Sequence, residues 1–331
     1  MKVNLIMNSK KGKDETYDMK RNDQSTIFTR PLVMALLATT CCLLWGSAFP
    51  AIKLGYQWFD ITAEATGTQI LFAGCRFTLA GILTVIIGSI LAGKVLMPKK
   101  ESLKKIVVLS IFQTSLQYFC FYVGLAHTTG VKSSILNGIS VFVAILIAAL
   151  VFKQEKLTAV KLLGSILGFC GIVLVNLTGA GLDFNFKLQG EGMIILSTVC
   201  YGISSALIRV YGKDENPVVL SGYQFTLGGL VMIVIGYLTG GRLNVWTGKG
   251  IAVVIYLAFV SAITYTVWSL LLRHNNVSKV AVFGCLNPVF GAILSALILK
   301  ESGQRFGIKE IIALVLISSG IFIVQKGGKS K

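Results

Sequence analysis

Long apolar segments without charged residues recur along the whole chain, separated by short polar stretches. A helix of about 20 apolar residues crosses the hydrocarbon core of a bilayer. Backbone groups in lipid have no water to bond, so each segment should be α-helical. Ten segments contain no Asp, Glu, Lys or Arg: 31–52, 77–93, 106–131, 133–152, 162–182, 192–208, 216–241, 250–272, 280–299 and 311–325.

This pattern predicts an all-α integral membrane protein with ten transmembrane helices. Only 14% of the 331 residues are charged, against about 25% in typical soluble proteins. Residues 1–30 mix acidic and basic side chains and lack an apolar core, so we expect a disordered tail. We place the helices near 32–52, 70–92, 106–126, 133–152, 162–178, 192–210, 218–239, 250–272, 279–299 and 309–325.

The formal charge of +17 is distributed as membrane topology would require. With the N-terminus inside, 22 of the 31 Lys and Arg residues fall on that side and 8 on the other, and Arg76 lies within a helix. Such an excess marks the cytoplasmic face. We therefore predict a multi-pass plasma-membrane protein with both termini cytoplasmic, in contact with membrane lipids. The basic residues form no stripe interleaved with aromatics, which argues against nucleic-acid binding.

Several other function classes are disfavoured by the residues present. All seven cysteines fall within predicted helices, so no disulfide framework is expected. His127 and His274 are far apart in sequence and lack the spacing of a zinc site. No glycine-rich phosphate loop of the Walker type occurs, so we predict no ATP binding. We predict no cofactor and no metal, and the oligomeric state stays open, a monomer included.

The two halves of the chain resemble each other. Segments 76–81 (RFTLAG) and 224–229 (QFTLGG) share four of six residues, and Trp45-Gly46 is similar to Tyr201-Gly202. We therefore predict two five-helix repeat domains, residues 31–178 and 190–325. Five further identical pairs lie 146 positions apart: Leu125 and Leu271, Val131 and Val277, Gly138 and Gly284, Val143 and Val289, and Glu155 and Glu301.

An odd number of helices per repeat fixes the relative orientation of the two copies. If the first copy begins in the cytoplasm, the second begins outside, so the fold class becomes two inverted five-helix repeats. Inverted repeats recur in secondary transporters, in which the rocking of two halves opens a central site to either side in turn. The pattern therefore favours a transporter.

Short motifs in this arrangement resemble the drug/metabolite transporter (DMT) superfamily, and more specifically its EamA-type ten-helix exporters. They are Trp45-Gly46-Ser47, Arg76-Phe77, Lys153-Gln154-Glu155 and Leu299-Lys300-Glu301. The resemblance covers about residues 32–325 and implies metabolite efflux through a cavity lined by several helices. One departure is that such proteins usually carry a proline in the fourth and ninth helices. Pro288 is present in the ninth, but Phe142 stands at the aligned position, so we expect a straighter fourth helix.

Polar and aromatic side chains inside the predicted helices recur on single helical faces. Polar groups in lipid normally face the protein interior or a watery cavity. Amides offer both donors and acceptors, and Tyr and Trp combine an apolar ring with a polar tip. Individual Ser and Thr residues are as well explained by helix–helix bonding. The predicted substrate-binding residues are Trp45, Ser47, Gln113, Gln117, Asn137, Tyr201, Ser204, Tyr265, Trp268 and Asn287.

Three further residues are singled out for structure and gating. Arg76 is the only charge deep within the apolar segments. It could pair with a substrate carboxylate, but we favour a structural anchor because its repeat mate is the uncharged Gln224. Pro50 and Pro288 are predicted to kink their helices or to act in gating, since proline removes a backbone donor. By contrast, Gly164, Gly168 and Gly171 indicate close helix packing in the fifth helix.

No Asp or Glu lies in the middle of any predicted helix, which limits the choice of solute. A lone cation would lack a counter-charge, so a neutral or zwitterionic, amino-acid-like metabolite fits better. The predicted function is a secondary transporter that exports such solutes by alternating access, and not an enzyme. Two alternatives stay open, a non-transporting membrane sensor or scaffold and, further from the pattern, an intramembrane enzyme. The substrate, the coupling ion and the direction of net transport are not determined by the sequence.

Overall fold

The computed structural model describes residues 28–153, 157–176, 186–212, 215–245, 247–274, 280, 282–299 and 307–327. The elements within these ranges are helices without any strand, which confirms the predicted all-α class. The first 27 residues of the predicted tail lie outside the described ranges, as do Gln154, Glu155, Lys300 and Glu301 of the family motifs.

Each of the ten predicted segments is helical in the described chain. Four of them, the third, fourth, sixth and ninth, consist of more than one element. The elements in chain order are α2 (Pro31–Trp58), α3 (Thr66–Ala92), α4 (Ser102–Leu109), η1 (Ser110–Leu116), α5 (Gln117–His127), α6 (Gly130–Asn137), α7 (Ser140–Leu146), η2 (Ile147–Val151), α8 (Ala159–Asn176), η3 (Leu188–Gly192), α9 (Met193–Tyr211), α10 (Pro217–Leu238), α11 (Gly248–His274), η4 (Val282–Cys285), α13 (Leu286–Leu299) and α14 (Ile308–Gly327).

Within the described residues, seven helical stretches are long and apolar enough to cross a bilayer. Two shorter apolar helices, Leu286–Leu299 and Ile311–Gly320, accompany them. The seven stretches are Pro31–Trp58, Thr66–Ala92, Ser102–His127, Gly130–Val151, Leu188–Ile208, Val218–Leu238 and Gly248–Trp268.

The fourth segment forms one helical stretch, Gly130–Val151, in which Gly138 and Ile139 form a turn between α6 and α7 and which ends in the π-helical η2. Gly138 and Ile139 keep right-handed helical backbone angles. Gly138 packs closely against Pro288 and Ile317, and Phe142 inserts beside Gly168. The expectation of a straighter fourth helix stays a prediction. The third segment also contains a π-helix, η1, between α4 and α5.

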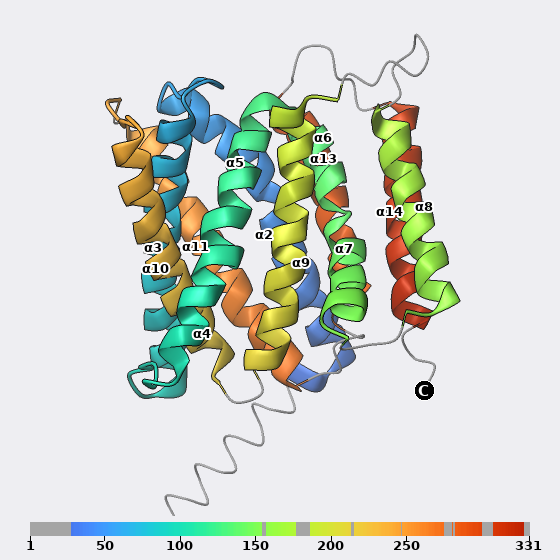
Figure 1. The fold of residues 1–331 in the computed structure, drawn as a ribbon, viewed down its shortest axis with the longest axis horizontal. Helices are drawn as coiled ribbons and strands as arrows, with labels where there is room; N and C mark the ends of the chain where they lie inside the picture. Colours follow the sequence, from blue (N-terminus) through green and yellow to red (C-terminus); the bar gives the residue numbers. More distant parts are fainter. Residues whose placement is uncertain are drawn as a thin grey trace, which may run out of the picture.

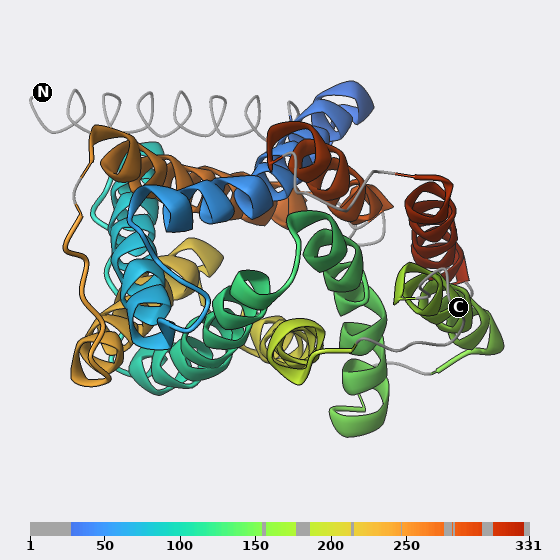
Figure 2. The same ribbon diagram turned by 90° about the horizontal axis from the view of Figure 1, so that it is seen from above.

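Two antiparallel helix pairs lie at opposite sides of the molecule, α3 with α10 and α8 with α14 (Figures 1 and 2). A Cβ atom at Gly74 would clash with the backbone of Gly229, and one at Gly81 with that of Gly222, so these helices touch along their backbones. In the second pair, Gly320 of α14 packs against the backbone of Gly164 and Gly168 of α8. The packing role predicted for the glycines of the fifth helix is thereby confirmed.

The central helices form two groups between these pairs. In one, α2 packs on α11 and α13, and α6 packs on α13. In the other, α9 packs on α5 and α7 (Figure 1). The two groups are joined where α6 contacts α9 and where α6 continues into α7. We call the end of the bundle at which α2 begins the terminal end and the end at which α2 stops the distal end. Helix α13 stops at the distal end, where Leu299 lies beside Gly130 at the start of α6.

The buried core differs between the two ends. On the distal side one large cluster joins side chains of α2, α3, α5, α6 and α9, among them Phe72, Tyr122 and Ile135. On the terminal side the described buried residues form two separate small clusters. One contains Ala38, Leu271 and Val280, and the other contains Ile106, Leu109 and Leu220.

Candidate functional site

Three predicted site residues form an aromatic group between α2 and α11. The ring of Trp45 lies 5.8 Å from that of Tyr265 and 5.0 Å from that of Trp268, centroid to centroid. Tyr265 and Trp268 are three residues apart on α11, so they share one helical face. All three rings are half-buried although they lie well inside apolar helices. A half-buried aromatic group at this depth is a surface on which an apolar part of a solute could rest.

Tyr118 extends this group to α5 and is a residue that the sequence interpretation missed. Its hydroxyl lies 3.3 Å from that of Tyr265, and Phe225 of α10 packs edge-on against Tyr265 at 4.7 Å. Tyr201 of α9 is within electrostatic range of both tyrosines. The signal available in sequence was the position of Tyr118 directly after the predicted Gln117. The group therefore draws side chains from helices of both halves of the chain.

Arg76 lies behind the aromatic group and is almost fully buried, with 3% of its surface exposed. Its guanidinium donates to the Tyr122 hydroxyl at 2.6 Å, to Ser261 Oγ at 2.9 Å and to the Leu257 carbonyl at 3.3 Å. It also lies 4.5 Å from the centroid of the Phe77 ring, a cation–π contact. These contacts tie α3 to α5 and α11, as an anchor would.

No carboxylate in the described part of the chain forms an ion pair with Arg76. Its positive charge is instead spread over hydroxyl, carbonyl and aromatic partners. The aromatic group, which includes Tyr118 at 6.0 Å from the guanidinium carbon, therefore lies in a positive field. Such a field favours a negatively charged group in its vicinity.

The predicted amides carry buried oxygens that no protein group satisfies. The side-chain carbonyl oxygens of Gln113, Gln117 and Asn287 have no hydrogen-bond partner in the described structure. Gln224, the repeat mate of Arg76, accepts a bond from Thr114, while its own amide nitrogen has no partner. Leaving such a buried group unpaired costs about 1–3 kcal/mol, so these oxygens are ready acceptors for an N–H or O–H donor.

Two predicted residues are satisfied elsewhere. Ser47 Oγ bonds the Leu44 carbonyl and the hydroxyl of the exposed Tyr256, so it lies at the α2–α11 surface. Ser204 is buried and bonds back to the carbonyl of Tyr201 in its own helix. The structure brings neither hydroxyl into the aromatic group.

The remaining predicted residues lie at interruptions of helices. Asn137 is half-buried and closes α6 directly before the turn at Gly138. Pro50 is buried inside the continuous helix α2. Pro288 lies near the start of α13, and its carbonyl accepts a bond from Ser134 of α6 at 2.9 Å. Pro288 thus joins the interrupted fourth segment to the ninth.

A pocket of about 360 Å³ opens at the distal end of α2 and includes Lys53, Tyr56 and Asp60 in its lining. It contains none of the predicted site residues. Tyr56 is eleven residues along α2 from Trp45, about 16 Å of helix. The pocket is therefore separate from the aromatic group.

The fold and the arrangement of apolar helices define a multi-pass α-helical membrane protein. The model of the EamA-like transporter family matches residues 32–177 and 188–325, nearly the whole described chain. The chain belongs to this family of membrane transporters.

Relatives across bacteria, archaea and plants support the assignment. An uncharacterized transporter of Bacillus subtilis, YvbV, is 24% identical, covering 90% of this chain and 93% of its own. An uncharacterized transporter of Archaeoglobus fulgidus is 27% identical over 89% of this chain and 98% of its own. A WAT1-related chloroplastic protein of Arabidopsis thaliana is 25% identical over 85% and 66%. A solved crystal structure, 17% identical, has the same fold with a TM-score of 0.63, over 90% of this chain and 99% of its own.

Proposed function

We propose that the protein exports small neutral or zwitterionic, amino-acid-like metabolites across the plasma membrane by alternating access. The half-buried aromatic group beside the buried Arg76 is the observation that carries this proposal. It combines an apolar platform with the positive field of Arg76 at a depth where lipid-facing polar groups would be costly.

Repeated contacts support an inverted arrangement of the two halves. In the α3–α10 pair, Gly81 meets Thr226, and Gly229 meets Thr78. In the alignment of segments 76–81 and 224–229, Gly81 corresponds to Gly229 and Thr78 to Thr226, each pair 148 positions apart. The two contacts are therefore the same contact seen from either repeat. Because the two helices run antiparallel, a twofold axis in the membrane plane would produce this pattern.

A second and independent pair of contacts supports the same axis. Gly46 of α2 meets Phe290 of α13, and Gly202 of α9 meets Ala144 of α7. Gly46 aligns with Gly202, and Ala144 lies 146 positions before Phe290, which is the offset of the five identical pairs. Two separate interfaces thus repeat under one alignment, as expected for inverted repeats that rock against each other.

The charge distribution assigns the two ends of the bundle to the two sides of the membrane. The terminal end carries the excess of Lys and Arg, and we assign it to the cytoplasm. The distal end then faces outward. Among the described residues the distal core is continuous and the terminal core is divided. We therefore propose that the outer side is the more tightly packed one in this structure, apart from the pocket at the end of α2, and that the structure corresponds to an inward-facing state of the cycle.

The chemistry of the site supports the solute class. A carboxylate is favoured near the positive field of Arg76. The unpaired side-chain oxygens of Gln113 and Gln117, on the same helical segment as Tyr118, are acceptors that ammonium or amide N–H groups of a solute could use. A side chain of the solute can rest on Trp45 and Trp268. A lone organic cation would meet Arg76 with no carboxylate near it in the described chain, so we expect it to be excluded.

Transport by purified protein in proteoliposomes, across a panel of amino acids, neutral metabolites and organic cations, tests the proposal. We expect flux of at least one neutral or zwitterionic solute and none of the cations. Gln117→Ala should reduce this flux, while the exposed Gln189→Ala serves as the matched control. A flat response to every solute would contradict transport, and flux of cations alone would contradict the solute class.

A further inference from the structure

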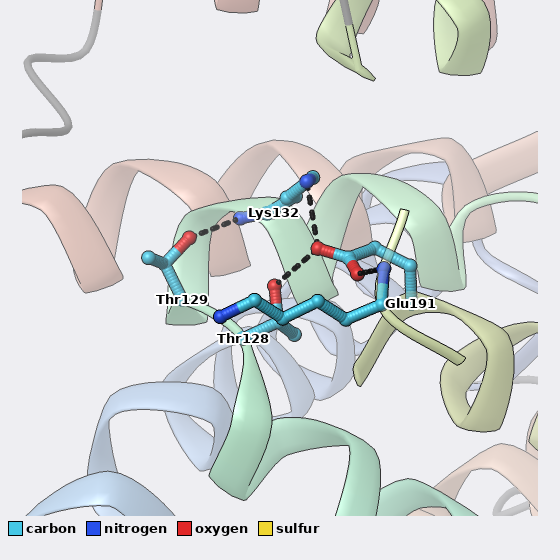
Figure 3. A network of polar contacts seen from close by, with 5 residues as sticks. Thr128, Thr129, Lys132 and Glu191 are labelled. Atoms are coloured by element: carbon cyan, nitrogen blue, oxygen red, sulfur yellow. Dashed lines mark hydrogen bonds and ion pairs between the residues drawn. The ribbon is translucent and has the colours of Figure 1, made fainter. Parts of the chain in front are cut away.

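An ion pair at the distal end joins the two halves of the chain. Lys132, in the first turn of α6, lies 2.6 Å from Glu191 in η3, and both side chains are largely buried (Figure 3). The Thr128 hydroxyl donates to the same carboxylate at 3.0 Å, and the backbone N–H of Lys187 donates to its second oxygen at 2.9 Å. Thr129 caps α6 by accepting from the backbone N–H of Lys132, which fixes the start of the helix.

The two partners lie in elements whose main contacts are with different helices. Helix α6 packs chiefly on α13, where Gly130 lies against Ser295 and Leu299, and makes fewer contacts with α9. Glu191 precedes α9, which packs on α5, with Gly124 against Ile194. The pair therefore adds a charged contact between α6 and η3, two elements that would have to separate if the distal side is to open outward.

We propose that the Lys132–Glu191 pair is a latch that holds the outer side closed in the inward-facing state. This inference rests on the proposed alternating-access function. In the closed state the two charges satisfy each other, and the carboxylate is further held by Thr128 and the Lys187 backbone. Separation of α6 from η3 breaks these bonds and returns both charged groups to water, so the latch adds to the stability of the closed outer side.

The repeat alignment places no equivalent pair on the inner side. Lys132 aligns with Ser278, and Glu191 aligns with Ala35, neither of which can carry a charge. An inverted repeat without charges at these positions cannot form the same pair when the inner side closes. The latch therefore makes the two end states unequal and favours the inward-facing one.

A second Lys–Glu pair provides an internal control. At the terminal end, Lys105 of α4 lies 3.0 Å from Glu215, which also accepts a bond from the Ser102 hydroxyl. Glu215 precedes α10, and α4 and α10 already pack against each other. This pair joins elements that already contact each other at the terminal end, so its loss should leave the balance between the end states unchanged.

The labelling of a buried cysteine tests the latch. Ile135 lies three residues after Lys132, on the same face of α6 and deeper in the bundle, and it is fully buried. In the Ile135→Cys protein we expect slow reaction with a membrane-impermeant maleimide applied from outside intact cells. Labelling of the parent protein, which retains its native cysteines, is subtracted.

Breaking the pair should expose this position. Lys132→Gln should raise the labelling rate of the introduced cysteine about fivefold or more, in the range typical of couplings between two states. Lys132→Arg retains the ion pair, so with this replacement the introduced cysteine should react at the same rate as in the Ile135→Cys protein alone. The same rate is expected with Lys105→Gln. Thr128→Val keeps both charges and removes one bond, so a smaller rise in the same direction is expected even if Lys132→Gln fails to reach the membrane.

Each outcome decides the proposal. Equal labelling in the Lys132→Gln and Lys132→Arg proteins, or no rise in Thr128→Val, would overturn the latch. An equal rise in Lys105→Gln would also overturn it, because it would indicate general loosening. The labelling needs no solute, so its result is separate from the flux assay. Absence of flux with the expected labelling counts against the transport function alone.

Discussion

The distal and terminal ends of this bundle are packed differently, although the proposed inverted repeats would build them from equivalent helices. At the distal end aromatic and aliphatic side chains of both halves form one continuous core, reinforced by the buried Lys132–Glu191 pair. At the terminal end the core divides into two small clusters in different groups of helices. Two similar halves can therefore produce an asymmetric molecule, as a carrier resting in one of its two end states requires.

Leu125 and Leu271 offer the sharpest test of this difference, because they are repeat mates and are both fully buried. Leu125 belongs to the distal core and Leu271 to a small terminal cluster. We expect Leu125→Ala to lower the free energy of unfolding by about 4 kcal/mol and Leu271→Ala by about 2 kcal/mol. Thermal or denaturant unfolding in detergent measures both, and equal losses would contradict the comparison.

Arg76 stabilises the distal half through three hydrogen bonds, and its replacement should have the next largest effect. Arg76→Gln leaves the Tyr122 hydroxyl, Ser261 and the Leu257 carbonyl without their charged donor, at a cost of about 3 kcal/mol. The exposed Arg242, which stacks on Tyr237, is the control, and Arg242→Gln should cost less than about 1 kcal/mol. A change in solute selectivity with normal stability would show that Arg76 acts on the solute instead.

Trp268 lies toward the terminal end, where the buried core is divided into two small clusters. Its replacement should therefore change transport more than stability. Trp268→Ala removes the ring that packs on Trp45 at 5.0 Å, and we expect transport to fall about tenfold, equivalent to about 1.4 kcal/mol. The replacement of a half-buried ring should leave the protein folded. Unchanged flux in a stable Trp268→Ala protein would place the pathway elsewhere.

The smallest expected effect concerns pH and the terminal ion pair. The Ser102 hydroxyl and then the Lys105 ammonium hold the pKa of Glu215 below its ordinary value of 4.5. A lowered carboxyl pKa stabilises the folded state above the ordinary value, and this stability is lost as the pH falls through the lowered pKa. Glu215→Gln should therefore reduce the melting temperature slightly at pH 7, and this reduction should disappear as the pH falls through the lowered pKa of Glu215. If the difference in melting temperature between the Glu215→Gln and unmodified proteins grows in acid, the lowered pKa of Glu215 is contradicted.

The sequence predicted the helical segments and one interface well. Charge-free runs located every helix because burial in lipid imposes a simple pattern on composition, and Gly164 and Gly168 marked the α8–α14 contact. The helical spacing of polar and aromatic residues correctly predicted that Tyr265 and Trp268 share one face of α11. It could not predict the turn at Gly138, which depends on contacts with Pro288 and Ile317 from distant parts of the chain.

The predicted site was less accurate for hydroxyl residues than for aromatic ones. A serine can bond the backbone of its own helix, as Ser204 does, so its position on a polar face does not show that it faces a solute. Tyr118 was missed because helical spacing gives the direction of a side chain but not the identity of its neighbour. The Lys132–Glu191 pair could not be predicted, since its two partners lie 59 positions apart in sequence.

Reciprocal distance changes between α2 and α9 test the central claim most directly. Spin labels at the exposed positions Gln57 and Gln189 report the distal end, and labels at Leu32 and Val210 report the terminal end. On addition of a transported solute, we expect a population with a longer distal distance and a shorter terminal one. If both distances stay fixed, or both lengthen together, the two halves do not rock against each other and alternating access by inverted repeats is wrong.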